Sequence, residues 1–290
     1  MSRQSSRVRA VPATPGAVQT IAIASGKGGV GKTQTAINLA CALAARGRRV
    51  LLLDASFALP NIDVALGLTP ARTLHDVLAG RCSLAEAVVN GPCGVQLIAG
   101  ASPAAPLPEP SVQQLGGLIQ AFSALPQVPD VLLIDVAPGA GNAVLSLLQA
   151  AREALLVVND EPTAQADALA LLRCLNQRYG MTRFRLLASM TFAQQEGRAL
   201  HERLLRLTEP LAGVALDYVG AIPFDDSLRR AVQRQRPLLE VFPRSRAALA
   251  YAALAERVDG WPLPANPRGQ LEFFVERLIA AQAAPRTGRP

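Results

Sequence analysis

The 290-residue sequence is poor in lysine, histidine, cysteine and aromatic residues. Its four cysteines include no CxxC pair and lie far from the two histidines, which argues against a zinc site and fits a reducing compartment. No stretch approaches the length of uninterrupted apolar sequence that a membrane span needs, and the arginine-bearing N-terminus has no apolar signal segment. We therefore expect a cytoplasmic protein.

The scarcity of lysine is the most informative of these features. Among 29 basic residues only Lys27 and Lys32 are lysines, and both lie within residues 26–33. Because the planar guanidinium of arginine cannot replace a compact ammonium group at every site, this placement indicates that both lysines have a chemical role. The net charge of +7 permits anionic partners without identifying one.

The apolar pattern predicts the fold class. Half of the residues are apolar and 18% are charged, which is typical of a folded domain. Short apolar runs alternate with segments of helical spacing, and this alternation predicts a doubly wound α/β fold with a mostly parallel sheet. We expect buried strands over residues 20–24, 50–53, 95–99, 131–134, 154–158, 184–190 and 214–222.

Four regions are expected along the chain. Residues 1–18 form a flexible basic tail, 19–259 the main domain, 260–282 a Pro-rich linker with a final helix, and 283–290 a second tail. The final helix is amphipathic, and its apolar stripe fits either core packing or a membrane surface. The stripe consists of Leu271, Phe274, Val275, Leu278 and Ile279, and the opposite side carries Glu272, Glu276 and Arg277.

A phosphate-binding pattern lies between the first expected strand and the helix that follows it. Residues 26–33, GKGGVGKT, match G-x-x-x-x-G-K-[ST]. In this pattern backbone amides and a helix N-terminus hold phosphates, Lys32 reaches the β- and γ-phosphates, and Thr33 offers a hydroxyl to Mg²⁺. The expected nucleotide contacts are Gly26, Lys27, Gly28, Gly29, Val30, Gly31, Lys32, Thr33 and Gln34.

A dinucleotide-binding loop is the alternative. Gly26, Gly28 and Gly31 also satisfy G-x-G-x-x-G, and Asp54 ends the next expected strand, where such folds place a ribose-binding acid. The lysine and hydroxyl that close the loop favour a triphosphate with magnesium, because a pyrophosphate site needs neither.

An acid at the end of a second buried strand completes the predicted site. Asp135 follows the apolar run VLLI and is the candidate that orients the magnesium shell, with a helix N-cap as its alternative role. Thr33, Asp54 and Asp135 are the predicted Mg²⁺ residues. The predicted catalytic residues are Lys27, Lys32, Asp54 and Asp135.

With Lys27 included, the loop resembles the deviant Walker A motif KGGVGKT of the MinD/ParA family of P-loop ATPases. The resemblance implies ATP and Mg²⁺ as ligands, a homodimer formed around ATP, and contact of Lys27 with the phosphates bound by the partner. Nearly the whole chain after residue 18 is similar to the flagellar-number regulators FleN and FlhG. Examples are LLLDASFALPNIDVALGL (51–68), LDYVGAIPFDDSLRRAVQRQRP (216–237) and WPLPANPRGQLEFFVERL (261–278).

The resemblance to these regulators implies a biological role. It implies an ATP-dependent switch that restrains flagellar number, acts on a FleQ-like transcription regulator and works beside an FlhF-like GTPase. It also implies peripheral contact of residues 270–280 with the inner membrane or cell pole. Direct DNA binding is not expected, because no base-reading motif accompanies the arginines. The competing interpretation is a nucleotide-binding adaptor with weak or no hydrolysis.

Two positions depart from the family pattern. The family's D-x-D motif has a second aspartate where this chain has Ser56, and a hydroxyl is a poor base at neutral pH, so we expect slow hydrolysis. Ser189 stands where the family usually places an adenine-recognising asparagine. Ser189 and the backbone around Pro223 are therefore the expected base contacts.

Overall fold

The computed structural model describes residues 17–100, 109–263 and 265–283. The two predicted tails lie outside this range except for residues 17, 18 and 283. Val18, assigned to the first tail, is buried beside the start of the first strand.

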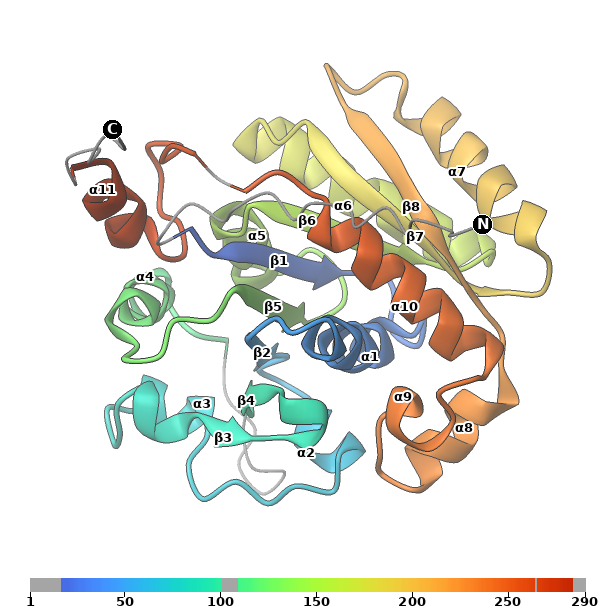
Figure 1. Cartoon of the computed structure of the whole chain (residues 1–290). Helices are drawn as coiled ribbons and strands as arrows, with labels where there is room; N and C mark the ends of the chain where they lie inside the picture. The colour runs from blue at the N-terminus through green and yellow to red at the C-terminus, as the bar shows by residue number, and fades with distance from the viewer. Residues whose placement is uncertain (1–16, 101–108, 264, 284–290) are drawn as a thin grey trace, which may run out of the picture.

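One eight-stranded sheet forms the centre of the molecule, in the order β3-β4-β2-β5-β1-β6-β7-β8 (Figure 1). Its pairings are parallel except for the short antiparallel pair β3–β4. The strands are β1 Gln19–Ala24, β2 Val50–Ala55, β3 Val89–Asn90, β4 Gln96–Ile98, β5 Val131–Val136, β6 Glu153–Val158, β7 Arg183–Thr191 and β8 Ala215–Pro223. The predicted fold class is confirmed, and only the two-residue β3 had no counterpart among the expected strands.

Helices cover both faces of this sheet. Helices α1 and α10 pack against each other on one face, while α4, α5, α6 and α7 follow one another across the other (Figure 1). The helices are α1 Lys32–Ala45, α2 Ile62–Ala65, α3 Leu74–Leu78, α4 Val112–Ala121, α5 Asn142–Ala150, α6 Pro162–Tyr179, α7 Gln194–Thr208, α8 Asp226–Gln233, α9 Leu238–Val241, α10 Arg246–Asp259 and α11 Val275–Ala283.

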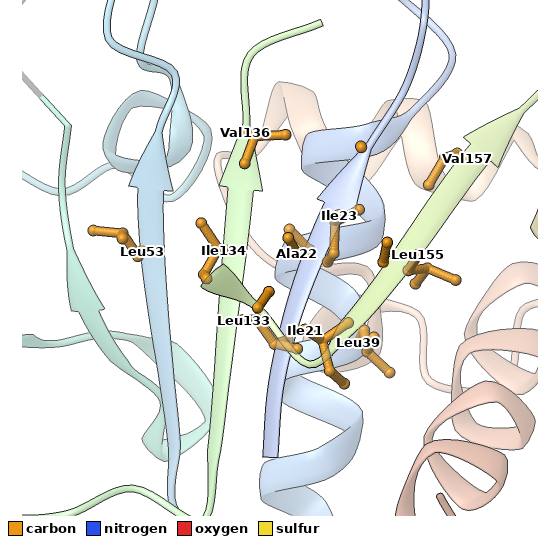
Figure 2. Close-up of a cluster of buried hydrophobic side chains, with 14 of the residues drawn as sticks. Ile21, Ala22, Ile23, Leu39, Leu53, Leu133, Ile134, Val136, Leu155 and Val157 are labelled. Carbon is orange, nitrogen blue, oxygen red and sulfur yellow. The ribbon is translucent and has the colours of Figure 1, made fainter. Parts of the chain in front are cut away.

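The hydrophobic core lies between the sheet and the helices on its two faces. Every residue of β1, β2 and β5 is buried, because both faces of these central strands lie under helices. Figure 2 shows Ile23, Leu133 and Leu155 of three neighbouring strands together with Leu39 of α1. Full burial of each such side chain contributes about 1.5–3 kcal/mol, so these strands form a rigid support for the loops at their carboxyl ends.

The order of the strands creates a switch point at one edge of the sheet. Consecutive strands β5 and β6 lie on opposite sides of β1, so the connections around the carboxyl end of β1 diverge. In open α/β sheets ligands bind at such a switch point. The loop 26–33 follows β1 directly and lies at this position.

The C-terminal segment packs against the domain. The rings of Phe273 and Phe274 meet Phe122 edge-on, with centroid distances of 5.1 and 5.9 Å. The final helix begins only at Val275, because Phe274 has a φ of 60° that interrupts helical geometry. Of the expected stripe, Leu271 and Ile279 are exposed.

The expected position of Glu272 on the polar side of that helix is wrong. Glu272 is only 1% exposed and pairs with Arg152 at 2.6 Å. It also accepts a hydrogen bond from the backbone N–H of Arg268. Because Glu272 precedes the helix, helical periodicity does not determine its direction, and the carboxylate turns inward to the basic groups.

We predict that the Glu272 ion pair holds the C-terminal segment on the domain. Glu272→Gln keeps the side-chain volume but leaves Arg152 without its buried partner, which should weaken docking by about 3 kcal/mol. The amide of Phe273, which donates to the carbonyl of Ala150, should then exchange with solvent about 100-fold faster in native-state hydrogen exchange. Glu276→Gln is the matched control, because Glu276 is exposed and glutamine keeps an oxygen that can accept from the Ser123 hydroxyl. It should leave this rate nearly unchanged. Equal rates in both variants would contradict the assignment.

Candidate functional site

The site is built on the start of helix α1. This helix begins at Lys32, and its N-cap residue, Gly31, has a φ of 88°. No side chain caps the helix, so its first amide groups remain available at the carboxyl edge of β1. The N-terminus of a helix of this length carries a partial positive charge, and with open amides it suits an anion.

The glycines of the loop meet two different steric demands. A Cβ added to Gly26 would lie 2.2 Å from the backbone carbon of Asp167, because helix α6 passes directly beside the loop. Gly29 and Gly31 have φ of +84° and +88°, which side chains rarely adopt. Gly28 and Gly29 are exposed, whereas Val30 is buried and anchors the loop to the core.

Lys32, Thr33 and Asp135 form a compact polar cluster under the loop. Lys32 Nζ lies 2.7 Å from Asp135 Oδ1, and the Thr33 hydroxyl donates to Asp135 Oδ2 at 2.7 Å. The lysine side chain is 9% exposed and the aspartate 1%. Both carboxylate oxygens therefore hold the first two residues of α1 against the end of β5.

Asp54 lies beside this cluster but is bound differently. It pairs with Asp135 in the register of β2 and β5. Its Oδ1 accepts from the amide of Ser56 at 3.0 Å, and its Oδ2 accepts from the amides of Asn61 and Ile62 at 2.9 and 3.0 Å. Burial and then the charge of Asp135 raise the pKa of Asp54 to about 7, although the three amides act to lower it.

Lys27 points to a separate set of partners. Its Nζ lies 2.5 Å from Glu161 Oε2 and 3.0 Å from Thr163 Oγ1, and its side chain is 38% exposed. Asn159 donates to the other oxygen of Glu161 at 2.8 Å. The hydrogen bond from Lys27 holds the pKa of the Glu161 carboxyl below its ordinary value.

Glu161 and Thr163 were not among the predicted site residues. They follow β6 in the sequence NDEPT, and β6 is the neighbour of β1 in the sheet. A polar run after a strand next to the phosphate loop is the signal that could have identified them.

The remaining predicted site residues are Ser189, Gln34 and Pro223. Ser189 is buried, with its hydroxyl 3.1 Å from the position of a Cβ on Gly31. Gln34 lies in the first turn of α1, where its carbonyl accepts from the Asn38 side chain. Pro223 ends β8, where it pairs with Thr191, two residues after Ser189.

These residues fit a nucleotide with a divalent cation. The loop exposes backbone at Gly28 and Gly29, the first amides of α1 have no side-chain cap, and the ammonium of Lys32 lies close by. Within residues 17–100, 109–263 and 265–283, no three His, Cys, Asp or Glu side chains cluster to hold a metal by themselves. The hydroxyl of Thr33 and the carboxylate of Asp135 suit Mg²⁺, which commonly takes its other ligands from phosphate and water.

The glycine loop, the open start of α1 and the buried lysine under it define a P-loop nucleotide-binding protein. Residues 21–238 match the family described as CobQ/CobB/MinD/ParA nucleotide binding domain. The chain belongs to this family of P-loop ATPases.

Relatives with flagellar names cover almost the full chain. The chain is 56% identical to the antiactivator FleN of Pseudomonas aeruginosa, covering 90% of this chain and 94% of that protein. It is 32% identical to the flagellum site-determining protein YlxH of Helicobacter pylori, covering 91% and 88%. The septum site-determining protein MinD of Pyrococcus horikoshii OT3, solved with Mg-ADP, is 28% identical with a TM-score of 0.65, covering 83% and 96%.

None of the helices in the described part of the chain is long and apolar enough to cross a membrane.

We predict that the two glycines Gly26 and Gly28 differ sharply in their tolerance of a side chain. Gly26→Ala forces a methyl group into the backbone of α6 and should reduce the free energy of unfolding by about 2 kcal/mol or more. Gly28→Ala meets only the side chain of Pro138 at 3.9 Å and should change stability by less than about 1 kcal/mol. Urea denaturation of the two variants measures the difference. Equal stabilities would show that α6 yields to the methyl group.

Proposed function

We propose that this chain is an ATP- and Mg²⁺-dependent dimeric switch that restrains flagellar number by antagonising a flagellar transcription regulator. The observation that carries the proposal is the environment of Lys27. It belongs to the phosphate loop, yet its ammonium lies on an exposed carboxylate and a hydroxyl rather than in the Asp135 cluster. The 56% identity to the antiactivator FleN over 94% of that protein supports the biological role.

Different residues of the chain would contact the phosphates, the cation and the base. The loop amides and the N-terminus of α1 would hold phosphate oxygens, and Lys32 would place its ammonium against them. Thr33 and Asp135 would hold Mg²⁺, which neutralises phosphate charge when bound. Ser189 and the backbone near Pro223 remain our proposed contacts to the base.

Lys27 has the properties of a group that changes partner. Its ion pair with Glu161 is exposed on both sides, with side chains 38% and 54% accessible, so the pair contributes little to stability and costs little to break. A ligand shifts a conformational equilibrium only by interacting differently with the two states. Transfer of Lys27 from Glu161 to phosphates held by a second copy would provide that difference.

We predict that Lys27→Ala binds ATP but does not dimerise with it, because Lys32 and the loop remain while the bridging ammonium is lost. Equilibrium binding of a fluorescent ATP analogue and light scattering after gel filtration measure the two properties separately. In a strain deleted for the gene, the parent should restore normal flagellar number and Lys27→Ala should not.

Two further variants separate the possible outcomes. Lys32→Ala should lose both binding and dimerisation, since it removes the buried ammonium under the loop. Lys27→Arg tests the need for a compact charge. ATP-induced dimers of Lys27→Ala, as abundant as those of the parent, would overturn the proposed role of Lys27.

We further propose that hydrolysis is slow, for a reason that lies at the end of β2. Ser56 occupies the position after Asp54-Ala55 and is buried. The two oxygens of Asp54 accept three backbone hydrogen bonds from residues 56, 61 and 62, which orient this carboxylate toward the turn after β2. A serine hydroxyl at position 56 is a poor base at neutral pH.

Introducing a carboxylate at position 56 should raise turnover. We expect Ser56→Asp to release phosphate from ATP at least about 10-fold faster than the parent, since general bases contribute about 10²–10⁴-fold. Steady-state phosphate release measures the rates, with Lys32→Ala as the inactive control. Equal rates in Ser56→Asp and the parent would contradict the assignment. ATP-bound parent dimers that persist without phosphate release would favour the adaptor interpretation.

The proposed partners are those implied by the resemblance to the flagellar-number regulators. We propose a FleQ-like regulator as the protein held by the dimer, an FlhF-like GTPase acting beside it, and a cytoplasmic location. Peripheral membrane contact through residues 270–280 belongs to the proposal as well. Leu271 and Ile279 are exposed while α11 is docked, and they are the apolar groups available to such a surface.

A further inference from the structure

A pocket beside helix α2 has a buried carboxylate among its lining residues. The cavity has a volume of about 430 Å³. Its walls come from α2, from the turn that follows α2 and from the loop between α8 and α9. Asp63, Leu68, Thr69, Pro70 and Gln235 are among the residues that line it. Of the described residues in this lining only Asp63 carries a charge, so the pocket combines one negative group with apolar and neutral polar surface.

The carboxylate of Asp63 has no partner in the folded chain. Asp63 is 6% exposed, and its Oδ1 is buried without a hydrogen bond. None of the ion pairs formed by residues 17–100, 109–263 and 265–283 includes it. Removing a carboxylate from water is costly unless hydrogen bonds or a cation offset the loss. An unpaired acid at this depth therefore indicates a partner that comes from outside the fold.

The place of Asp63 in the first turn of α2 does not account for its burial. The amides of Asn61 and Ile62, where α2 begins, donate to Asp54 Oδ2 at 2.9 and 3.0 Å. Asp54 thus takes the capping role that an acid at a helix start often has. Since α2 has only four residues, its dipole gives Asp63 little support. The same two hydrogen bonds place the pocket wall next to the nucleotide edge of the sheet.

Gln235 is held against α2 in a conformation that side chains rarely adopt. Its φ is 52°, and its Nε2 donates to the carbonyl of Val64 at 2.7 Å. A Cβ on Gly67 would lie 3.4 Å from the Cβ of Gln235, so the two segments are in close contact. Backbone strain of this kind persists only where the surroundings impose it. The loop after α8 is therefore a fixed wall of the pocket, and the amide oxygen of Gln235 is a further acceptor in it.

We propose that this pocket binds an arginine side chain of a partner protein. The guanidinium would donate to the carboxylate of Asp63, the hydroxyl of Thr69 and the amide oxygen of Gln235. Its apolar stem would lie on Leu68 and Pro70. Arginine fits better than lysine, because a guanidinium has five donors and is more weakly hydrated than an ammonium group.

The surroundings of the pocket favour a protein over a metal ion. Leu59 and Val64 lie on the same segment as Asp63 and are 77% and 46% exposed. Apolar groups around an arginine anchor are typical of the centres of protein interfaces. A metal ion would find a single carboxylate here, since no three His, Cys, Asp or Glu side chains cluster in the described part of the chain. The inference requires neither bound nucleotide nor the proposed flagellar role.

The test titrates short peptides into the isotope-labelled full chain without nucleotide and follows the amide resonances by NMR. The probe is acetyl-Gly-Arg-Gly-amide, and the same peptide with citrulline in place of arginine is the uncharged control. The arginine peptide should shift the amides of Gly67 and Thr69 and bind at least about 10-fold more tightly than the citrulline peptide. Equal binding of the two peptides, or shifts confined to other parts of the chain, would overturn the proposal. Tighter binding of free L-arginine than of the peptide would identify a metabolite site and overturn the assignment to a protein.

Asp63→Asn removes the charge and keeps the shape of the side chain. It should weaken binding of the arginine peptide at least about 10-fold. Its melting temperature should equal or exceed that of the parent, because an uncompensated buried charge is lost. The exposed Asp226→Asn of α8 is the matched control and should change neither property.

A second variant keeps the test decisive if Asp63→Asn does not fold. Gln235→Ala changes an exposed residue and should weaken binding of the arginine peptide several-fold through loss of one acceptor. Circular dichroism checks the fold of each variant. Unchanged peptide binding in a folded Asp63→Asn, or in Gln235→Ala where Asp63→Asn is unfolded, would overturn the proposal.

Discussion

The buried ion pair between Lys32 and Asp135 joins the phosphate loop to the sheet. Desolvation of two charges is expensive, and here it is offset by short contacts and by the Thr33 hydroxyl on the second carboxylate oxygen. Asp54, a second buried acid, lies next to Asp135 in register. Burial, and then the charge of Asp135, raises the pKa of Asp54 to about 7. A divalent cation at this edge would complete the charge balance, which is the strongest electrostatic argument for magnesium here.

The strand register of the sheet places the ends of three strands at the same edge. Ile23 pairs with Asp135 across β1 and β5, and Asp54 pairs with Asp135 across β2 and β5. Three adjacent parallel strands therefore end at one level, and their loops leave from the same edge. Because these strands are buried along their whole length, the core fixes the backbone positions of the two acids.

Local signals explain how much of this could be predicted from the sequence. Apolar runs of strand length and the loop pattern determined the fold class, because buried parallel strands and phosphate loops are encoded by neighbouring residues. Local sequence patterns could not predict the position of Glu272 or the partners of Lys27. Each depends on residues that are far apart in sequence, such as Arg152 with Glu272 or Lys27 with Glu161. The hydrogen bonds of Asp54 were not predicted either. They depend on how residues 56–62 turn after the strand, because the donating amides lie in that segment.

The two lysines of the chain illustrate how a single loop can combine affinity with switching. Lys32 is held under the loop by a buried carboxylate, so its position is preorganised and its removal would leave Asp135 uncompensated. Lys27 is held by an exposed carboxylate whose hold is weakened by solvent and salt. An ammonium group in a weak ion pair can move to a second set of phosphates at little cost in free energy. An ammonium group in a buried ion pair cannot. In the proposed switch, the difference in burial of Lys27 and Lys32 would allow nucleotide binding and dimerisation to be separated.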